Sequence, residues 1–195
     1  MRLEKAGWSG MVKSIVGTGG FVVVMVLAAL IAGTIGGSIE RTLVVFFISL
    51  IAVLGMGVYS GNSGILSFGH LGFMGLGAYL SGILTMPIAM KQMTLANLPP
   101  FLATAHFDLL GATVIAVIFV MVVALVVGIV ISKLEGSAAT ITTLGLLVIV
   151  HGIIIGARDF TRGSQSFFGV PRVTDLSVAA ICAVLAIIVA RFYKD

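Results

Sequence analysis

Long apolar stretches fill most of the chain, and the charged residues fall between them. These charged positions enclose uncharged, aliphatic-rich runs of 26, 49, 24, 22 and 15 residues. Because a helix that crosses about 30 Å of hydrocarbon needs roughly 20 residues without an unpaired charge, the run of 49 has room for two helices. Turn-forming residues from Ser60 to Gly64 divide that run. The pattern predicts about six transmembrane helices, at residues 15–35, 43–59, 65–86, 109–131, 138–155 and 176–190.

The composition indicates the same fold class. Hydrophobic residues make up 59% and charged residues 9% of the 195 positions, which leaves too few polar side chains to cover a soluble globule. We therefore expect an all-α integral membrane protein in contact with the lipid bilayer, folded as a single transmembrane domain over residues 1–195. The net charge of +4 comes from basic residues scattered over the loops, so a nucleic-acid partner is not expected.

Few side chains in the predicted spans are suited to catalysis. Cys182 is the only cysteine, which excludes an internal disulfide and a cysteine-built metal site. No acidic residue lies within a predicted span, and neither H-E-x-x-H nor G-x-S-x-G occurs. The sequence therefore predicts a protein that is not an enzyme, with no catalytic residue, no metal site and no cofactor in this chain.

The basic residues before the first predicted helix indicate the orientation. Arg2, Lys5 and Lys13 precede it, and positively charged flanks remain on the cytoplasmic side. The N-terminus is therefore predicted to be cytoplasmic. The longest loops, near residues 91–108 and 157–175, are too short for a soluble domain, and Pro99 with Pro100 predicts an extended turn in the first.

The segment from Leu66 to Gly82 is apolar, yet it carries five glycines. Small residues let helices approach closely in a membrane, which would make this a tightly packed central helix. Glycine also permits an irregular or broken helix that lines a solute pathway. Asn62, Ser63 and His70 favour the second account, because polar groups at membrane depth are costly unless they are paired or hydrated. Both accounts stay open at this point.

The same segment carries a recognisable motif. The run Gly64-Ile-Leu-Ser-Phe-Gly-His-Leu-Gly-Phe-Met-Gly-Leu-Gly-Ala-Tyr79 closely resembles the signature of permease subunits of branched-chain amino acid ABC transporters, G-x-L-S-F/L-G-H-x-x-F-x-G-x-G-A-Y. Residues 133–136 with 143–144, and 161–165 with 169–171, are similar to two later family segments. The resemblance is closest to the M-type member of the permease pair. The relatives continue with further helices, so we expect this chain to be an incomplete permease domain lacking its C-terminal part.

The resemblance implies a function and a set of partners. The protein would be one of two permease subunits of an ATP-driven ABC importer for branched-chain amino acids in the bacterial-type cytoplasmic (inner) membrane. Two ABC ATPase subunits would bind the ATP, and a periplasmic solute-binding protein would deliver the solute. A permease of the same family for another amino acid, urea or an amide is an alternative. An uncoupled membrane channel or scaffold protein is another.

The resemblance also implies which residues line the translocation pathway. The signature and the polar residues just before it supply the first set: Asn62, Ser63, Gly64, Ser67, Gly69, His70, Gly75, Gly77, Ala78 and Tyr79. Thr140, Thr143 and His151 are further candidates. For the threonines a structural role is the alternative, because hydroxyls in membrane helices often bond to their own backbone. For His151 the alternative is contact with interfacial water near a helix end.

Overall fold

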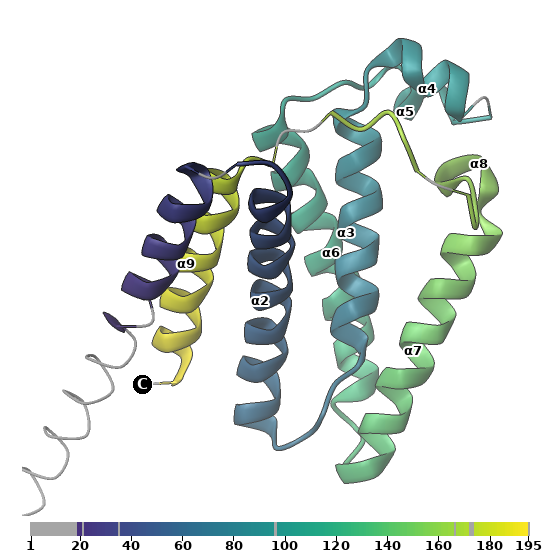
Figure 1. The fold of residues 1–195 in the computed structure, drawn as a ribbon. Coiled ribbons are helices and arrows are strands. Elements are labelled where there is room, and N and C mark those ends of the chain that lie inside the picture. Colours follow the sequence, from purple (N-terminus) through teal and green to yellow (C-terminus); the bar gives the residue numbers. More distant parts are fainter. Residues whose placement is uncertain are drawn as a thin grey trace, which may run out of the picture. The chain divides into compact units, whose positions relative to one another are not determined.

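The computed structural model describes residues 19–20, 22–34, 36–95, 97–165, 167–171 and 174–194. These residues form helices joined by turns and loops, and no strand occurs among them. In chain order the helices are Val22–Thr34, α2 (Gly37–Ser63), α3 (Gly69–Thr85), α4 (Ile88–Thr94), α5 (Pro100–Thr104), α6 (Leu109–Ile131), α7 (Gly136–Gly156), α8 (Arg158–Thr161) and α9 (Leu176–Lys194) (Figure 1). The predicted all-α fold is confirmed.

The described helices of membrane length are fewer than the predicted spans. Helices α2, α6, α7 and α9 are long and apolar enough to cross a membrane. Helices α3 and α4 meet this criterion only as a pair, and they are bent by 119° at the break between them, as in a broken span or a re-entrant loop. The described residues thus contain four such helices, or five with the bent pair, where about six were predicted. The Val22–Thr34 helix is part of the first predicted span, and the beginning of that span lies outside the described residues.

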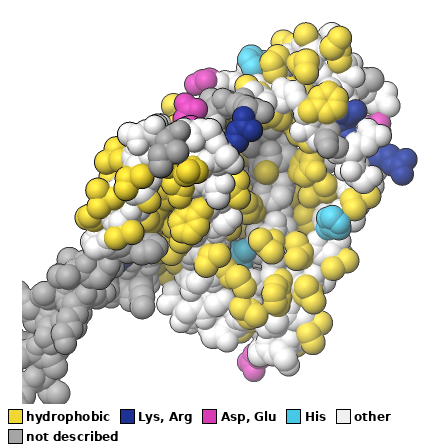
Figure 2. Space-filling model, viewed as in Figure 1, with side chains coloured by type: hydrophobic (Ala, Val, Ile, Leu, Met, Phe, Trp, Pro, Cys, Tyr) yellow, Lys and Arg dark blue, Asp and Glu magenta, His cyan; other side chains and the backbone are white. Residues whose placement is uncertain are grey.

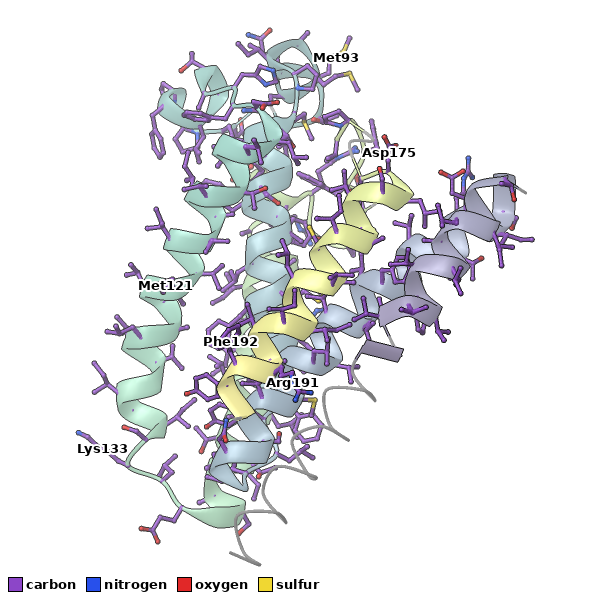
Figure 3. All side chains as sticks on the ribbon, turned by 90° about the vertical axis from the view of Figure 1, so that its left-hand side faces the viewer. Met93, Met121, Lys133, Asp175, Arg191 and Phe192 are labelled. Atoms are coloured by element: carbon purple, nitrogen blue, oxygen red, sulfur yellow. The ribbon has the colours of Figure 1, made fainter. Side chains whose placement is uncertain are left out.

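The surface of these helices is suited to hydrocarbon. Hydrophobic side chains cover much of their visible flanks (Figure 2). On α6, Leu110 is 75% and Met121 62% exposed, and Met121 points away from the neighbouring helices (Figure 3). Lys133 lies just after α6, and Asp175 lies just before α9 (Figure 3). Because moving apolar surface out of water is worth roughly 25 cal/mol per Å², this distribution fits a bilayer and confirms the prediction of an integral membrane protein.

The boundary between α2 and α3 differs from the prediction. Helix α2 continues to Ser63 and α3 begins only at Gly69, so the predicted ends at residues 59 and 65 are wrong. Asn62 Nδ2 donates to Val58 O at 3.1 Å, and Ser63 Oγ donates to Tyr59 O at 2.8 Å. Such bonds to the preceding turn let polar residues remain in a helix. Gly64 then makes the turn with a φ of +67°, a conformation that glycine adopts without steric cost.

Contacts divide the chain into two compact units, which are described separately. The core of the first unit, the described parts of Met1–Leu54 and Thr174–Asp195, includes fully buried Phe47 and Ala183. In the second unit, Gly55–Val173, α3 packs against both α6 and α7 (Figure 1). The single-domain organisation stays a prediction.

An apolar cluster in the second unit lies at the C-terminal end of α3. Its buried members are Ile83, Met86, Leu95 and Leu98. Helix α5 begins at Pro100, where the sequence predicted an extended turn. That expectation was wrong because proline is compatible with the first turn of a helix, where its missing N–H has no partner to lose.

Candidate functional site

The glycines of α3 fall into two groups. Gly69, Gly72 and Gly82 are buried against neighbouring side chains. A Cβ at Gly69 would lie 3.2 Å from Leu146, and one at Gly82 would lie 3.1 Å from Phe167, both tighter than ordinary contact. At Gly75 and Gly77 the nearest atoms would be 3.5 Å away, in the ordinary range. The first group is therefore packed closely, at 3.5 Å or less from an added Cβ, whereas Gly75 and Gly77 are only half-buried.

Polar side chains meet at the N-terminal end of α3. Ser67 is only 4% exposed, and its Oγ lies 3.1 Å from His70 Nδ1. The Phe68 N–H donates to Thr143 Oγ1 at 3.3 Å, and this hydroxyl donates to Thr140 O at 2.9 Å. The bond from Phe68 to Thr143 joins the start of α3 to α7, and the Ser67 and Thr143 hydroxyls and His70 Nδ1 each have a partner within the protein.

The His70 ring also contacts the C-terminal part of α2. It packs edge-on against Tyr59, with 5.2 Å between the ring centroids. Three predicted pathway residues, Ser67, His70 and Thr143, are thus brought together around the turn between α2 and α3. Their partners tie segments together, and this supports the structural account of Thr143 that the sequence left open.

Other predicted pathway residues lie apart from this cluster. Asn62 and Ser63 are exposed and bond to the backbone of α2. Ala78 is also exposed. Gly77 borders a second space, of about 480 Å³, between α3 and α6, where the hydroxyls of Ser81 and Thr113 bond to carbonyls of their own helices.

A cavity of about 500 Å³ lies between α3, α7 and the loop after α8. The two helices lie close together near Gly69 and Gly72 and diverge toward α8 (Figure 1). The lining residues are Leu71, Gly72, Gly75 and Tyr79 of α3, Leu147, Val150, His151, Ile154 and Ile155 of α7, and Gly163, Ser164 and Gln165 of the loop. Three predicted site residues, Gly75, Tyr79 and His151, therefore face one space.

The loop at one end of this cavity is held by local bonds. Thr161 Oγ1 donates to the carbonyls of Ile154 and Ala157 and accepts from the Gly163 N–H at 3.2 Å. Gly163 has a φ of +63°, and a Cβ there would lie 2.9 Å from Ile155 O. A residue larger than glycine is therefore excluded at position 163, where the loop turns back toward α3.

Two aromatic residues of this loop make contacts, one with α3 and one with Arg162. Phe167 packs edge-on against Tyr79, with 5.3 Å between ring centroids. The Arg162 guanidinium lies 4.3 Å from the centre of the Phe168 ring, and its Nη2 donates to Gln165 Oε1 at 3.3 Å. Gln165 thereby keeps its amide N–H groups for other acceptors.

The polar groups around the cavity are of kinds that can hydrogen-bond to a solute. In the described chain, the Tyr79 hydroxyl, the His151 ring and the Ser164 hydroxyl have no hydrogen-bond partner. None of the residues that line the cavity is charged at neutral pH, with histidine taken as neutral. A group of three or more His, Cys, Asp or Glu residues suited to a metal does not occur in the part of the chain described.

Ser164 and Gln165 were not predicted as site residues. They lie in the loop whose residues 161–165 resemble a family segment. Only the approach of that loop to α3 places them beside Tyr79. No feature of residues 161–165 taken alone shows which of them faces a cavity.

Comparisons with known proteins were made for the whole chain. A family model described as "Branched-chain amino acid transport system / permease component" matches residues 38–192. This match includes α3, α7 and every residue that lines the cavity. A search of curated proteins and a search of solved structures each found no match.

Proposed function

Because the chain belongs to the family of permease components of branched-chain amino acid transport systems, we propose that it is a membrane subunit of an ATP-driven importer for these amino acids. Membership of this family makes it a transport subunit and not an enzyme. The observation that carries the proposal is the extent of the family match, which covers nearly all of α2 and α9 and every helix between them.

The geometry of α3 supports a role in translocation. Residues 64–68 before it are not helical, and Met86 and Pro87 separate it from α4. Interrupted helices are tolerated at membrane depth where the free backbone groups are buried in protein or line a cavity. We assign the pathway to the side of α3 that faces α7, with Gly75, Tyr79 and His151 along it. The pathway roles of Asn62, Ser63 and Ala78 stay predictions.

The proposed partners follow from the kind of transporter. A second permease subunit completes the pathway, two ABC ATPases bind and hydrolyse ATP, and a periplasmic solute-binding protein delivers the amino acid. ATP binding and hydrolysis shift the populations of inward-open and outward-open states, and the permease itself carries out no chemistry. The assembly lies in the cytoplasmic (inner) membrane, and this chain is its M-type permease.

Uptake by the purified assembly tests this proposal. The complex is extracted gently from its own membrane, its subunits are identified by native mass spectrometry, and it is reconstituted into proteoliposomes with the solute-binding protein. We expect ATP-dependent accumulation of radiolabelled leucine, isoleucine or valine, and no accumulation with a non-hydrolysable ATP analogue. Solute entry that is independent of ATP, or a native assembly without ATPase subunits, would contradict coupled import.

A further inference from the structure

We propose that a groove between the Val22–Thr34 helix and α9 binds a membrane lipid whose headgroup carries a primary ammonium group. The groove belongs to the first unit and shares no residue with the cavity between α3 and α7. The proposal concerns the contact between this chain and the bilayer, so it does not rest on the proposed function.

The groove is formed by the exposed sides of these two apolar helices. Their other sides are buried with Phe47 of α2 in the core of the first unit. The groove has a volume of about 930 Å³, and its aliphatic walls include Leu30 at 63% and Ile181 at 61% exposed. Apolar surface on a membrane-length helix is stable when apolar groups cover it, and in a bilayer the acyl chains of lipids are such groups.

The length of the groove matches one leaflet of the bilayer. From Asp175 to Leu185 it follows α9 over a rise of about 15 Å at 1.5 Å per residue. On the Val22–Thr34 helix its lining runs from Gly33 back to Val26. The hydrocarbon core of a bilayer is about 30 Å thick, so a transmembrane helix of another subunit would pack along about twice this length. The groove therefore fits the acyl part of a lipid in a single leaflet.

Two acidic side chains line one end of the groove. Asp175 directly precedes α9, and Glu40 lies in the first turn of α2. Figure 3 shows Asp175 at the N-terminal end of α9, with Arg191 at its other end. Within the described part of the chain, neither carboxylate has an ion-pair or hydrogen-bond partner. The acids lie where the helices begin, which is the level of the lipid headgroups.

The chemistry of a carboxylate selects the headgroup. An ionised carboxylate only accepts hydrogen bonds, and a primary ammonium has three N–H donors. Hydrogen bonds between two ionised groups are about twice as strong as those between neutral ones. A trimethylammonium headgroup carries the same charge without a donor, and a phosphoglycerol headgroup has no cation to set against the acids. The groove is therefore selective for an ethanolamine phospholipid over choline and glycerol phospholipids.

Native mass spectrometry of the purified complex tests this selectivity. The probes are dioleoyl-phosphatidylethanolamine, dioleoyl-phosphatidylcholine and dioleoyl-phosphatidylglycerol, added in equal amounts to the detergent, so that only the headgroup differs. We expect the ethanolamine lipid to be retained about threefold or more above each of the other two. Equal retention of the ethanolamine and choline lipids would overturn the proposal, because the donors would then contribute nothing.

Two matched double variants test the location of the headgroup. Glu40→Gln with Asp175→Asn removes the two charges of the groove and keeps the size of the side chains. Asp108→Asn with Glu135→Gln is the control, because these exposed acids directly precede α6 and α7 and do not line the groove. We expect the first pair to bring retention of the ethanolamine lipid to within about twofold of the choline lipid, and the control to keep the preference. Equal effects of the two pairs would exclude this end of the groove.

A second matched pair tests the position of the acyl chains. Gly33 lines the groove and Gly128 lies on α6, and an added Cβ would meet no atom within 4 Å at either position. Gly33→Leu is expected to lower retention of the ethanolamine lipid about threefold or more, and Gly128→Leu less than about twofold. Unchanged retention in Gly33→Leu would refute the groove as the site. If a helix of another subunit fills the groove, lipid retention would ignore both pairs of variants, and this result would also overturn the proposal.

Discussion

Lys91 is a fully buried cation on α4 whose hydrogen bonds go to backbone carbonyls. Its Nζ donates to Leu102 O at 3.1 Å and to Ala105 O. These carbonyls belong to the C-terminal turn of α5 and the residue after it, where a helix leaves its last acceptors without partners. Lys91 therefore fixes α5 against α4, and no charged solute is needed to explain its burial.

Replacing this lysine by an apolar residue of similar length tests its anchoring role. Lys91→Met is expected to lower the free energy of unfolding by about 1–3 kcal/mol, because two acceptors lose a charged donor. The measurement is thermal unfolding in detergent together with limited proteolysis between residues 95 and 108. Gln92→Met, which places the same side chain at the exposed neighbouring position, is the control and should change neither. Equal stability of both variants would mean that the buried amine contributes nothing net.

The contact between Ser67 and His70 is also expected to contribute to the stability of the protein. The two side chains lie 3.1 Å apart and Ser67 is buried, so each satisfies the other. Ser67→Ala and His70→Leu should each destabilise the protein, and the double variant should lose about 1 kcal/mol less than the sum of the two. Additive losses in thermal unfolding would show that the two groups do not interact.

At the scale of elements, the packing of the loop after α8 against α3 depends on one glycine, Gly82. The ring of Phe167 lies where a side chain at Gly82 would project, with Cε1 3.1 Å from the position of a Cβ. The same ring packs against Tyr79 one turn earlier in α3. The position of the loop that closes one end of the cavity thus depends on the absence of a side chain at residue 82.

Gly82→Ala is therefore expected to destabilise the protein although alanine favours helix. At Gly145 of α7 no atom lies within 4 Å of an added Cβ, so Gly145→Ala should show only the gain in helix propensity, up to about 0.5–1 kcal/mol. Thermal unfolding of the two variants provides the comparison. Phe167→Leu combined with Gly82→Ala should recover part of the loss, whereas no recovery would place the strain elsewhere.

The elements show why the sequence predicted the spans better than the site. Charge-free runs identified α6 and α7 to within about two residues, because an unpaired charge in hydrocarbon is costly. The end of α2 was misplaced because Asn62 and Ser63 bond to their own helix, and this choice depends on rotamers rather than on composition. Ser164 and Gln165 were missed because only tertiary packing places their loop beside α3.

At the scale of the molecule, the orientation of the chain decides which membrane face each helix end reaches. In the second unit, Met93 on α4 and Lys133 after α6 lie at opposite ends of the packed helices (Figure 3). Met93 is 82% exposed. With the N-terminus in the cytoplasm, the predicted order of spans places residue 93 outside and residue 133 inside.

Single cysteines at these positions decide between this orientation and its reverse. Cys182 is the only native cysteine, so Cys182→Ala provides a background without thiols and also serves as the unlabelled control. In sealed right-side-out vesicles, a membrane-impermeant maleimide should modify Met93→Cys at once and Lys133→Cys only after permeabilisation. The opposite result would place the N-terminus outside, although the fold would stand. Labelling of both without permeabilisation would be incompatible with α6 as a membrane span, because that helix rises about 35 Å over its 23 residues at 1.5 Å each.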